Sequence, residues 1–299
     1  MDRFLAMNVY VAVAEEESFA AAARRLGMSP PAVTRAVAAL ERHLNVRLLT
    51  RTTRFVRATD AGRRYLEHAR RIIAAADEGD AAAAGAHATP RGQLTVTAPV
   101  LFGRMYVTPG IVDYLRRYPD VSVSALLLDR MVNLLEEGVD VGVRIGELPD
   151  SGLKAVGVGH VRRVVCASPA YLKAHGAPKS PHDLARHCIV ASNAVTPSGD
   201  WRFGSGRSAL SVRVKPRLTV TNNEAAIVAA AAGFGVTRLL SYQTAPYVAA
   251  GQLKVVLQDY EPARLPVHIV HGEGGHASAK VRAFVDLLAA KLRADKALH

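Results

Sequence analysis

The sequence predicts a mixed α/β protein that begins with a separate helical domain. Residues 1–60 place apolar side chains three and four positions apart, which is the spacing of helices with one buried face. Beyond residue 94, short apolar runs alternate with helical patterns, which is typical of an α/β fold with a largely parallel sheet. Between these parts, residues 85–92 are rich in Gly, Ala and Pro, as in a linker.

The expected elements follow from these patterns. An alanine-rich stretch predicts one long helix over residues 60–85. Further helices are expected at residues 104–118, 223–232 and 279–293. Strands are expected at residues 94–98, 121–128, 139–145, 161–167, 218–220, 255–257 and 267–270.

The composition agrees with at least two folded domains. The chain has 299 residues and is 49% hydrophobic, which is enough for more than one core and excludes a mainly disordered chain. Its two cysteines, Cys166 and Cys188, cannot form a disulfide framework, and we expect both to be reduced. No signal-peptide pattern occurs at the N-terminus, and no uncharged apolar stretch reaches the ~18 residues of a membrane span. We therefore expect a soluble, cytoplasmic protein without a membrane partner.

Two short helices within residues 18–45 have clear start and stop signals. Ser18 can cap the first helix, and Gly27 suits the left-handed residue that ends it. Ser29 can cap the second helix, with Pro30 at its first position and Asn45 at its end. The second helix aligns one apolar stripe, formed by Val33, Val37, Leu40 and Leu44. The pattern fits a helix-turn-helix, although by itself it also fits an ordinary helical hairpin.

Three further features favour DNA binding by these helices. The alanines of the first helix permit close approach to the second, and Thr34 and Arg35 form an outward-facing pair of donors. Residues 46–57 alternate enough to form a β-hairpin wing with arginines at its tip. Residues 18–71 contain twelve arginines and three carboxylates, a local charge of +9 within a chain of formal charge +12. Such a patch attracts DNA phosphates, and arginine favours bidentate contacts.

Several of these motifs closely resemble the LysR-type transcriptional regulators, and the resemblance extends over the whole chain. It implies a winged helix-turn-helix DNA-binding domain over residues 1–59, a linker and dimerisation helix with a hinge over 60–88, and an effector-binding domain over 89–299. The segments with the resemblance are MDRF (1–4), SFAAAARRLG (18–27), SPPAVTR (29–35), LE (40–41), VRLLTR (46–51) and ATDAG (58–62).

The resemblance also implies which residues contact DNA. Many relatives have a polar side chain where this chain has Pro30, so more of the base reading would depend on Thr34, Arg35 and DNA shape. The implied DNA-binding residues are Ser29, Pro30, Pro31, Thr34, Arg35, Arg51 and Arg54.

In the family the linker helix pairs with a second copy. Here Thr59 can cap that helix, and an apolar stripe includes Tyr65, Leu66, Ala69, Ile72, Ile73 and Ala76. The resemblance implies a homodimer through this helix, a homotetramer in the complete assembly, and RNA polymerase as a further partner. A dimer would let two recognition helices read two half-sites of double-stranded promoter DNA.

The effector-binding domain of the family has the fold of periplasmic solute-binding proteins. Lobe I would comprise residues 91–160 and 268–299, lobe II residues 161–267, with a small effector between them. The implied effector-binding residues are Pro99, Val100, Phe102, Arg144, Ile145, Gly146, Thr221, Asn222 and Arg238.

Each of these residues has a structural alternative. Pro99, Val100 and Ile145 also fit simple packing, Arg144 could serve a carboxylate such as Glu147, and Arg238 could support a loop. Residues 91–299 contain 25 Lys and Arg against 16 Asp and Glu. This excess fits an anionic effector bound at a helix N-terminus, and it equally fits a solvated surface.

Catalytic and metal-binding motifs are absent from the sequence. The pair Gly233 and Gly235 lacks the third glycine of a dinucleotide-binding loop, and no Walker motif or G-x-S-x-G elbow occurs. His271 and His276 lie in a glycine-rich loop without H-E-x-x-H spacing, and His182, His187 and Cys188 give no complete tetrahedral set. We expect no enzyme activity, cofactor or metal. The alternative is a stand-alone α/β solute-binding protein or enzyme whose helical N-terminus serves only assembly.

Overall fold

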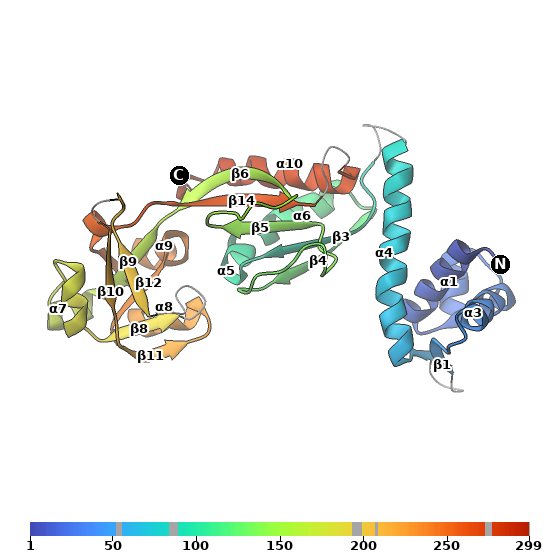
Figure 1. Ribbon diagram of the computed structural model, residues 1–299, viewed down its shortest axis with the longest axis horizontal. Coiled ribbons are helices and arrows are strands. Elements are labelled where there is room, and N and C mark those ends of the chain that lie inside the picture. The colour runs from blue at the N-terminus through green and yellow to red at the C-terminus, as the bar shows by residue number, and fades with distance from the viewer. Residues whose placement is uncertain (52–55, 84–88, 193–198, 207–208, 273–276, 299) are drawn as a thin grey trace. The chain divides into compact units, whose positions relative to one another are not determined.

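The computed structural model divides the chain into two compact units, residues 1–88 and 89–299 (Figure 1). The structure describes residues 1–51, 56–83, 89–192, 199–206, 209–272 and 277–298.

The first unit consists of helices and one short hairpin. Its elements are α1 (Arg3–Glu16), α2 (Phe19–Leu26), α3 (Pro30–Leu44), β1 (Leu49–Arg51), β2 (Val56–Ala58) and α4 (Asp60–Ala83). The helix ends predicted from sequence are confirmed: Ser18 accepts a hydrogen bond from the Ala21 N–H, and Gly27 and Asn45 adopt left-handed conformations. Of the predicted stripe, Val33, Val37 and Leu40 are buried and Leu44 is partly buried.

The start of α4 packs against α1. The Tyr10 hydroxyl donates to the Gly62 carbonyl at 2.8 Å, and its ring meets Tyr65 edge to face. Further along, the Glu15 carboxylate bonds to both Arg25 of α2 and Arg70 of α4. These contacts fix the first half of the long helix to the helical domain.

The second unit is built on two five-stranded sheets. The first sheet has the order β4-β3-β5-β14-β6 and the second the order β11-β8-β12-β7-β13. The strands of the first sheet are β3 (Gly92–Ala98), β4 (Val121–Leu127), β5 (Val141–Ile145), β6 (Lys154–Val161) and β14 (Leu265–His271). Those of the second are β7 (Arg163–Ala167), β8 (Ile189–Ser192), β11 (Pro216–Val220), β12 (Val236–Leu240) and β13 (Lys254–Val256). A separate hairpin is formed by β9 (Asp200–Phe203) and β10 (Leu210–Arg213).

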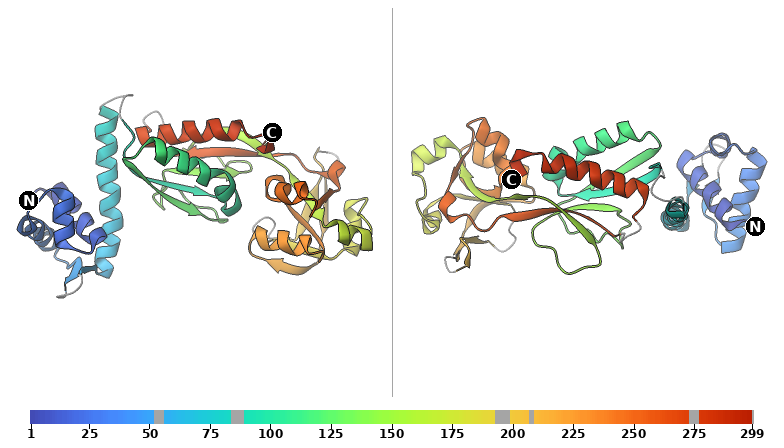
Figure 2. Two further views of the ribbon diagram at one scale, coloured as in Figure 1. Left: turned by 180° about the vertical axis from the view of Figure 1, so that it is seen from behind. Right: turned by 90° about the horizontal axis from the view of Figure 1, so that it is seen from above.

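Both sheets are mixed, so the expectation of a largely parallel sheet was wrong. In the first sheet β3 runs parallel to β4 and β5, but β14 is antiparallel to β5 and β6. In the second, β8 runs parallel to β11 and β12, but β7 is antiparallel to β12 and β13. The expected strand at 161–167 is divided at Arg162, where the chain passes from one sheet to the other. The returning strand β14 lies beside β6 (Figures 1 and 2).

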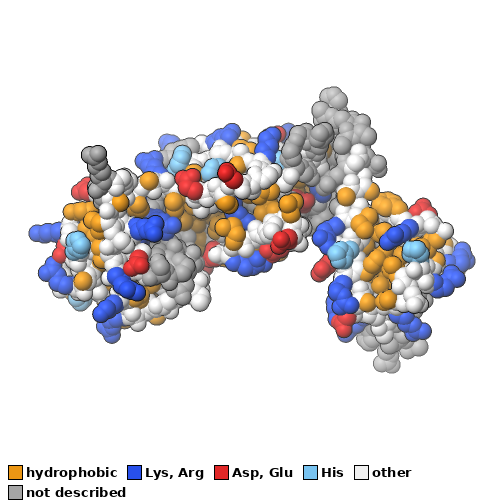
Figure 3. All heavy atoms as spheres, viewed as in Figure 1, with side chains coloured by type: hydrophobic (Ala, Val, Ile, Leu, Met, Phe, Trp, Pro, Cys, Tyr) orange, Lys and Arg blue, Asp and Glu red, His pale blue; other side chains and the backbone are white. Residues whose placement is uncertain are grey.

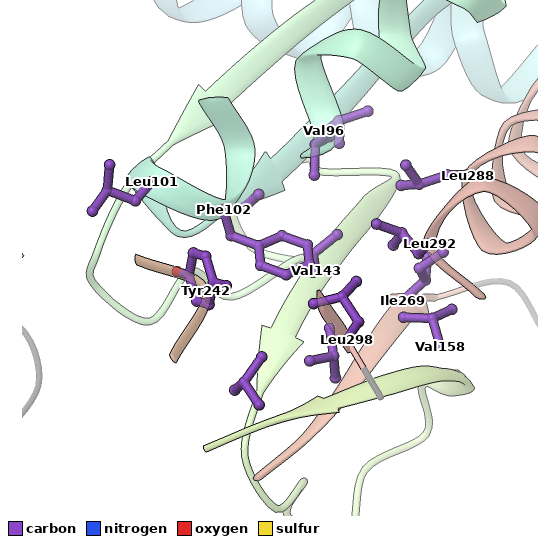
Figure 4. Close-up of a cluster of buried hydrophobic side chains, with 14 of the residues drawn as sticks. Val96, Leu101, Phe102, Val143, Val158, Tyr242, Ile269, Leu288, Leu292 and Leu298 are labelled. Carbon is purple, nitrogen blue, oxygen red and sulfur yellow. The ribbon is translucent and has the colours of Figure 1, made fainter. Parts of the chain in front are cut away.

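Helices cover the sheets and complete the core. The α-helices described in this unit are α5 (Val100–Phe102), α6 (Thr108–Arg117), α7 (Pro169–His175), α8 (Asn223–Ala231), α9 (Ser241–Ala249) and α10 (Ala279–Arg293), and a π-helical turn (Gly103–Val107) joins α5 to α6. Leu288 and Leu292 of α10 pack over Val96, Val143 and Ile269 of the first sheet (Figure 4). Tyr242 of α9 joins the same cluster beside Phe102, so the two lobes share one apolar core.

Candidate nucleic-acid interface and effector region

The start of α3 is exposed and presents the predicted recognition residues. Ser29 caps the helix, and Pro30 and Pro31 occupy its first two positions. Both prolines and Arg35 are exposed, and Thr34 is partly exposed. Proline has no backbone N–H, and the Ala32 N–H is already bonded to Ser29. The surface offered to a partner at this end of α3 therefore consists of side chains.

Thr34 has a defined hydrogen-bonding role on this surface. Its hydroxyl donates to the Pro30 carbonyl at 3.0 Å. The single hydroxyl proton is therefore occupied, and the lone pairs and the methyl group remain for a partner. In the major groove these groups suit an amino donor or the methyl group of thymine.

The wing is held to α3 through one carboxylate. An oxygen of Glu41 accepts hydrogen bonds from the N–H groups of Leu48 at 2.8 Å and Leu49 at 3.0 Å. The Thr59 hydroxyl also donates to the Arg47 carbonyl at 2.8 Å. These bonds fix the base of the hairpin relative to the recognition helix.

Only part of the predicted wing lies within the described residues. Arg51 pairs in register with Val56 at the end of the described strands, and Arg57 is exposed on β2. Arg54, the predicted tip residue, lies outside the described residues.

The basic patch divides into paired and available arginines. Arg25, Arg63 and Arg70 form ion pairs with carboxylates of the same unit. Within the part of the chain that the structure describes, Arg35 makes no ion pair. Basic side chains are spread over the face of this unit seen in Figure 3. Such charge suits a polyanion, and Arg35 is the arginine best placed beside Thr34 to meet one.

In lobe I, the carboxyl ends of β3 and β4 lie beside each other. Pro99 precedes α5, and the Val100 N–H donates to the Asp129 carboxylate at 3.0 Å. Phe102 is fully buried, with its ring centroid 4.8 Å from Tyr106 and 5.2 Å from Tyr242. Phe102 is thus a core residue at the junction of the lobes, and Asp129 is a neighbour of Val100 that the sequence analysis did not single out.

The segment 144–146 ends β5. The Arg144 guanidinium donates to the Val132 carbonyl, and burial lowers the pKa of Arg144. Gly146 has a positive φ of 115°, and its N–H donates to Pro266 at 2.8 Å. Ile145 is half-buried. Arg144 therefore supports the loop that contains Val132.

Arg238 is buried on the opposite side of the second sheet from α8. It is 5% exposed, lies 5.1 Å above the Phe203 ring, and donates to the Arg202 carbonyl at 2.6 Å. Burial, together with the charge of Arg163, lowers the pKa of Arg238 to about 10. This arginine holds the β9 strand against the sheet.

Lobe II contributes a different set of polar groups near lobe I. Thr221 and Asn222 are exposed, and Asn222 caps α8 by accepting from the Ala225 N–H at 2.8 Å. The adjacent Glu224 forms an ion pair with Arg104 of lobe I at 2.5 Å.

Among the residues that the structure describes, three buried side-chain oxygens on α8, β8 and β12 have no hydrogen-bond partner: Ser192 Oγ, Asn223 Oδ1 and Thr237 Oγ1. Asn223 begins a helix that the sequence predicts, whereas Ser192 and Thr237 lie on β8 and β12, two strands that were not predicted. Asp129, by contrast, directly follows a predicted strand, and a polar residue at that position is a recognisable signal.

Neither a metal centre nor a membrane span is found in the described residues. They contain no group of three or more His, Cys, Asp or Glu side chains placed to hold a metal. Searched over the same residues, no helix has the length and apolarity needed to cross a bilayer. Both cysteines are free thiols, and burial raises the pKa of Cys166 to about 12.

Comparison with protein families gives two matches that together span most of the chain. Residues 4–63 match the bacterial regulatory helix-turn-helix protein family of the LysR type, and residues 87–293 match the LysR substrate binding domain. A transcriptional repressor of Pseudomonas aeruginosa is 34% identical, covering 96% of this chain and 91% of its own. The transcriptional activator TtdR of Escherichia coli is 31% identical, covering 95% of this chain and 92% of its own.

Solved structures agree with the fold. The LysR-type regulator CrgA of Neisseria meningitidis matches with a TM-score of 0.62 and 30% identity, over 96% of this chain and 98% of that one. Full-length AphB of Vibrio cholerae matches with a TM-score of 0.61 and 23% identity, over 95% and 98% of the two chains.

These findings confirm the predicted family and the α/β fold with an N-terminal helix-turn-helix. The family and the relatives are transcriptional regulators and not enzymes, so the alternative of an enzyme with a helical assembly domain is set aside. The chain belongs to the LysR family of bacterial transcriptional regulators.

Proposed function

We propose that this LysR-family regulator reads promoter DNA with the exposed start of α3 and responds to a small effector bound between its two lobes. The observation that supports DNA reading best is the pair Thr34 and Arg35, presented on a capped helix whose wing is held by Glu41. Arg51 and Arg54 of the wing would contact the backbone, and Ser29, Pro30 and Pro31 would pack against the groove wall.

A binding experiment with the full chain tests DNA reading. Fluorescence anisotropy would use labelled duplexes from the intergenic DNA on either side of the gene. Arg35→Ala should weaken binding by about 10- to 100-fold, because one bidentate base contact contributes about 1–3 kcal/mol. Arg116→Ala on α6 is the matched control, since Arg116 is an exposed arginine of the other unit. Wild-type protein that shifts none of these duplexes, or equal affinity in Arg35→Ala, would contradict the proposal.

The functional domains are proposed at the boundaries expected from sequence: residues 1–59 for DNA binding, 60–88 for dimerisation, and 89–299 for effector binding. Two copies would pair through α4, where Ile72 is 45% exposed and can be covered by a partner. We propose a homotetramer as the complete assembly and RNA polymerase as a further partner. Light scattering of wild type and Ile72→Glu tests the pairing, because a charge at the seam should lower the mass.

Because its proposed target is chromosomal DNA, the protein would act in the cytoplasm. The effector would lie where the carboxyl ends of strands from both lobes meet, as ligands do in open α/β sheets. The first-choice contacts are Pro99, Val100, Ile145, Gly146, Thr221 and Asn222. Phe102, Arg144 and Arg238 would hold the elements that present these contact residues. Binding would change how subunits pack and so the spacing and bend of the bound DNA.

A further inference from the structure

We infer that the effector is a neutral or cationic molecule that donates hydrogen bonds, and not a carboxylate. This inference concerns the chemical class of the ligand and rests on the proposed effector function. It follows from the groups that each lobe presents near the strand ends.

On the lobe I side, the first N–H group at the start of α5 already binds a carboxylate of the protein. The Val100 N–H at the start of α5 bonds to the Asp129 carboxylate at 3.0 Å. Asp129 is exposed, so it adds a negative charge at the end of β4. Burial is the main cause of the raised pKa of Tyr242, and the charge of Asp129 raises that pKa further. Asp129 therefore lies within electrostatic range of α9 in lobe II. An anionic ligand would meet repulsion here, whereas an ammonium or amide N–H would be attracted.

The arginines near these strand ends are engaged elsewhere. Arg104 pairs with Glu224, Arg144 donates to the Val132 carbonyl, and Arg238 faces Phe203 on the far side of the sheet. Arg104 and Glu224 neutralise each other, whereas Asp129 makes no ion pair with any residue that the structure describes. The overall positive charge of the domain is therefore not concentrated at this place.

On the lobe II side, the relevant groups are three buried, uncharged side-chain oxygens. Ser192, Asn223 and Thr237 are 4%, 5% and 0% exposed, and their side-chain oxygens form no hydrogen bond within the described parts of the chain. Thr237 is in register with Val190, and Ser192 lies two residues further along β8, so both point to the same side of the sheet. That side is the one packed by α8, the helix that Asn223 begins.

Unpaired buried oxygens destabilise a folded protein and need an explanation. A ligand that completes their hydrogen bonds would account for them. An amide N–H or ammonium group can donate to all three oxygens, and the Asn223 amide oxygen can be satisfied only by a donor. A carboxylate supplies none, and it could only accept from the two hydroxyls.

A probe series on one scaffold tests this class. Full-length protein would be titrated with benzamide, benzylamine and benzoate, with binding followed by saturation-transfer NMR. We expect benzamide and benzylammonium to bind at least tenfold more tightly than benzoate. Benzoate binding as tightly as benzamide, or no binding by benzamide and benzylammonium, would overturn the inference.

A charge variant makes the test specific for Asp129. Asp129→Asn keeps an oxygen that can accept from Val100 but removes the charge, so benzoate should gain at least fivefold relative to benzylammonium. Asp120→Asn, an exposed aspartate of the same lobe before β4, is the control and should leave the ratio unchanged. An unchanged ratio in Asp129→Asn would also count against the inference.

A second measurement needs no probe. Thr237→Val removes an unpaired hydroxyl at nearly constant shape, and it should raise the Tm of the ligand-free protein by about 2–4 °C. Thr97→Val is the matched control, because the buried Thr97 hydroxyl donates to the Leu126 carbonyl at 2.8 Å and its loss should lower the Tm. A lower Tm in Thr237→Val would show that its hydroxyl is structural. DNA binding measured in parallel separates the outcomes: if it persists while the probe series fails, only the ligand class is refuted.

Discussion

Glu41 and Leu48 join the recognition helix to the wing: the carboxylate near the end of α3 accepts the Leu48 N–H at 2.8 Å, and the Leu49 N–H binds the same oxygen. Two backbone donors that follow the helix would otherwise lack a partner. The pairing also sets the direction in which the hairpin leaves α3. Its removal should therefore affect both folding and DNA affinity.

Glu41→Ala should destabilise the DNA-binding unit by about 1–3 kcal/mol, because it leaves two partly buried N–H groups unsatisfied. It should also weaken binding to all DNA sequences alike, since the wing loses its position. Urea unfolding and anisotropy check the two effects. Glu67→Ala, at an exposed position of α4, should change neither.

Gly62 is required for contact between α4 and the wing. A Cβ at this position would lie 2.1 Å from the Leu48 carbonyl oxygen, so Gly62→Ala forces the backbone apart. We expect a loss of about 1–3 kcal/mol in the free energy of unfolding. Gly79→Ala is the control on the same helix: its Cβ meets nothing within 4 Å, and it should gain about 1 kcal/mol from helix propensity. Equal stability of the two variants would refute the close contact.

Thr34 can be dissected with two nearly isosteric changes. Thr34→Val keeps the methyl group and removes the oxygen, whereas Thr34→Ser keeps the oxygen and removes the methyl. If the methyl packs against thymine, Thr34→Ser should lose about 1 kcal/mol at one base pair and Thr34→Val should not. Selection of bound sequences from a random duplex library measures the preference.

Arg54→Ala should instead weaken binding to all DNA sequences alike. It should also reduce the slope of log K against log salt concentration by about one unit.

The Glu15 ion pairs predict a pH dependence for the N-terminal unit. Burial alone would raise the pKa of Glu15, but hydrogen bonds from Arg70 and Arg25 outweigh it and lower the pKa below its ordinary value of 4.5. Because the folded-state pKa is lowered, the stabilisation is present above pH 4.5 and is lost as the pH falls through the lowered pKa. The side chains are partly exposed, so we expect about 0.5–1 kcal/mol. Unfolding curves between pH 3 and 7 should converge for wild type and Glu15→Gln at the acidic end.

The helical unit is predictable from sequence because its helix ends depend on local chemistry. Ser18, Gly27, Ser29 and Asn45 each act on neighbouring backbone groups, so no knowledge of the rest of the fold is needed. The last helix, α10, is similarly predicted at both ends, since its apolar stripe is regular.

The strands of the second sheet are harder to predict from the sequence. β12 contains Arg238, whose charge suggests an exposed loop, and only contact with Trp201 and Phe203 makes its burial possible. β8 is only four residues long. Without these strands, the side of the sheet that each candidate faces is unknown. Arg144 and Arg238 therefore stand out in the sequence for their charge, although in the fold their guanidinium groups contact backbone carbonyls.

The paired prolines at the start of α3 have a consequence for how the protein approaches a duplex. A helix that begins with free amides can fasten itself to a phosphate at a fixed distance. Here Pro30 and Pro31 have no amide hydrogen, and Ser29 already binds those of Ala32 and Val33. Attachment to the sugar-phosphate backbone would then depend on long arginine side chains, which can adjust to local variation in the duplex. If Thr34 and Arg35 read bases as proposed, no backbone amide at these positions would fix the helix to one phosphate, and its place along the groove would be set by those two side chains.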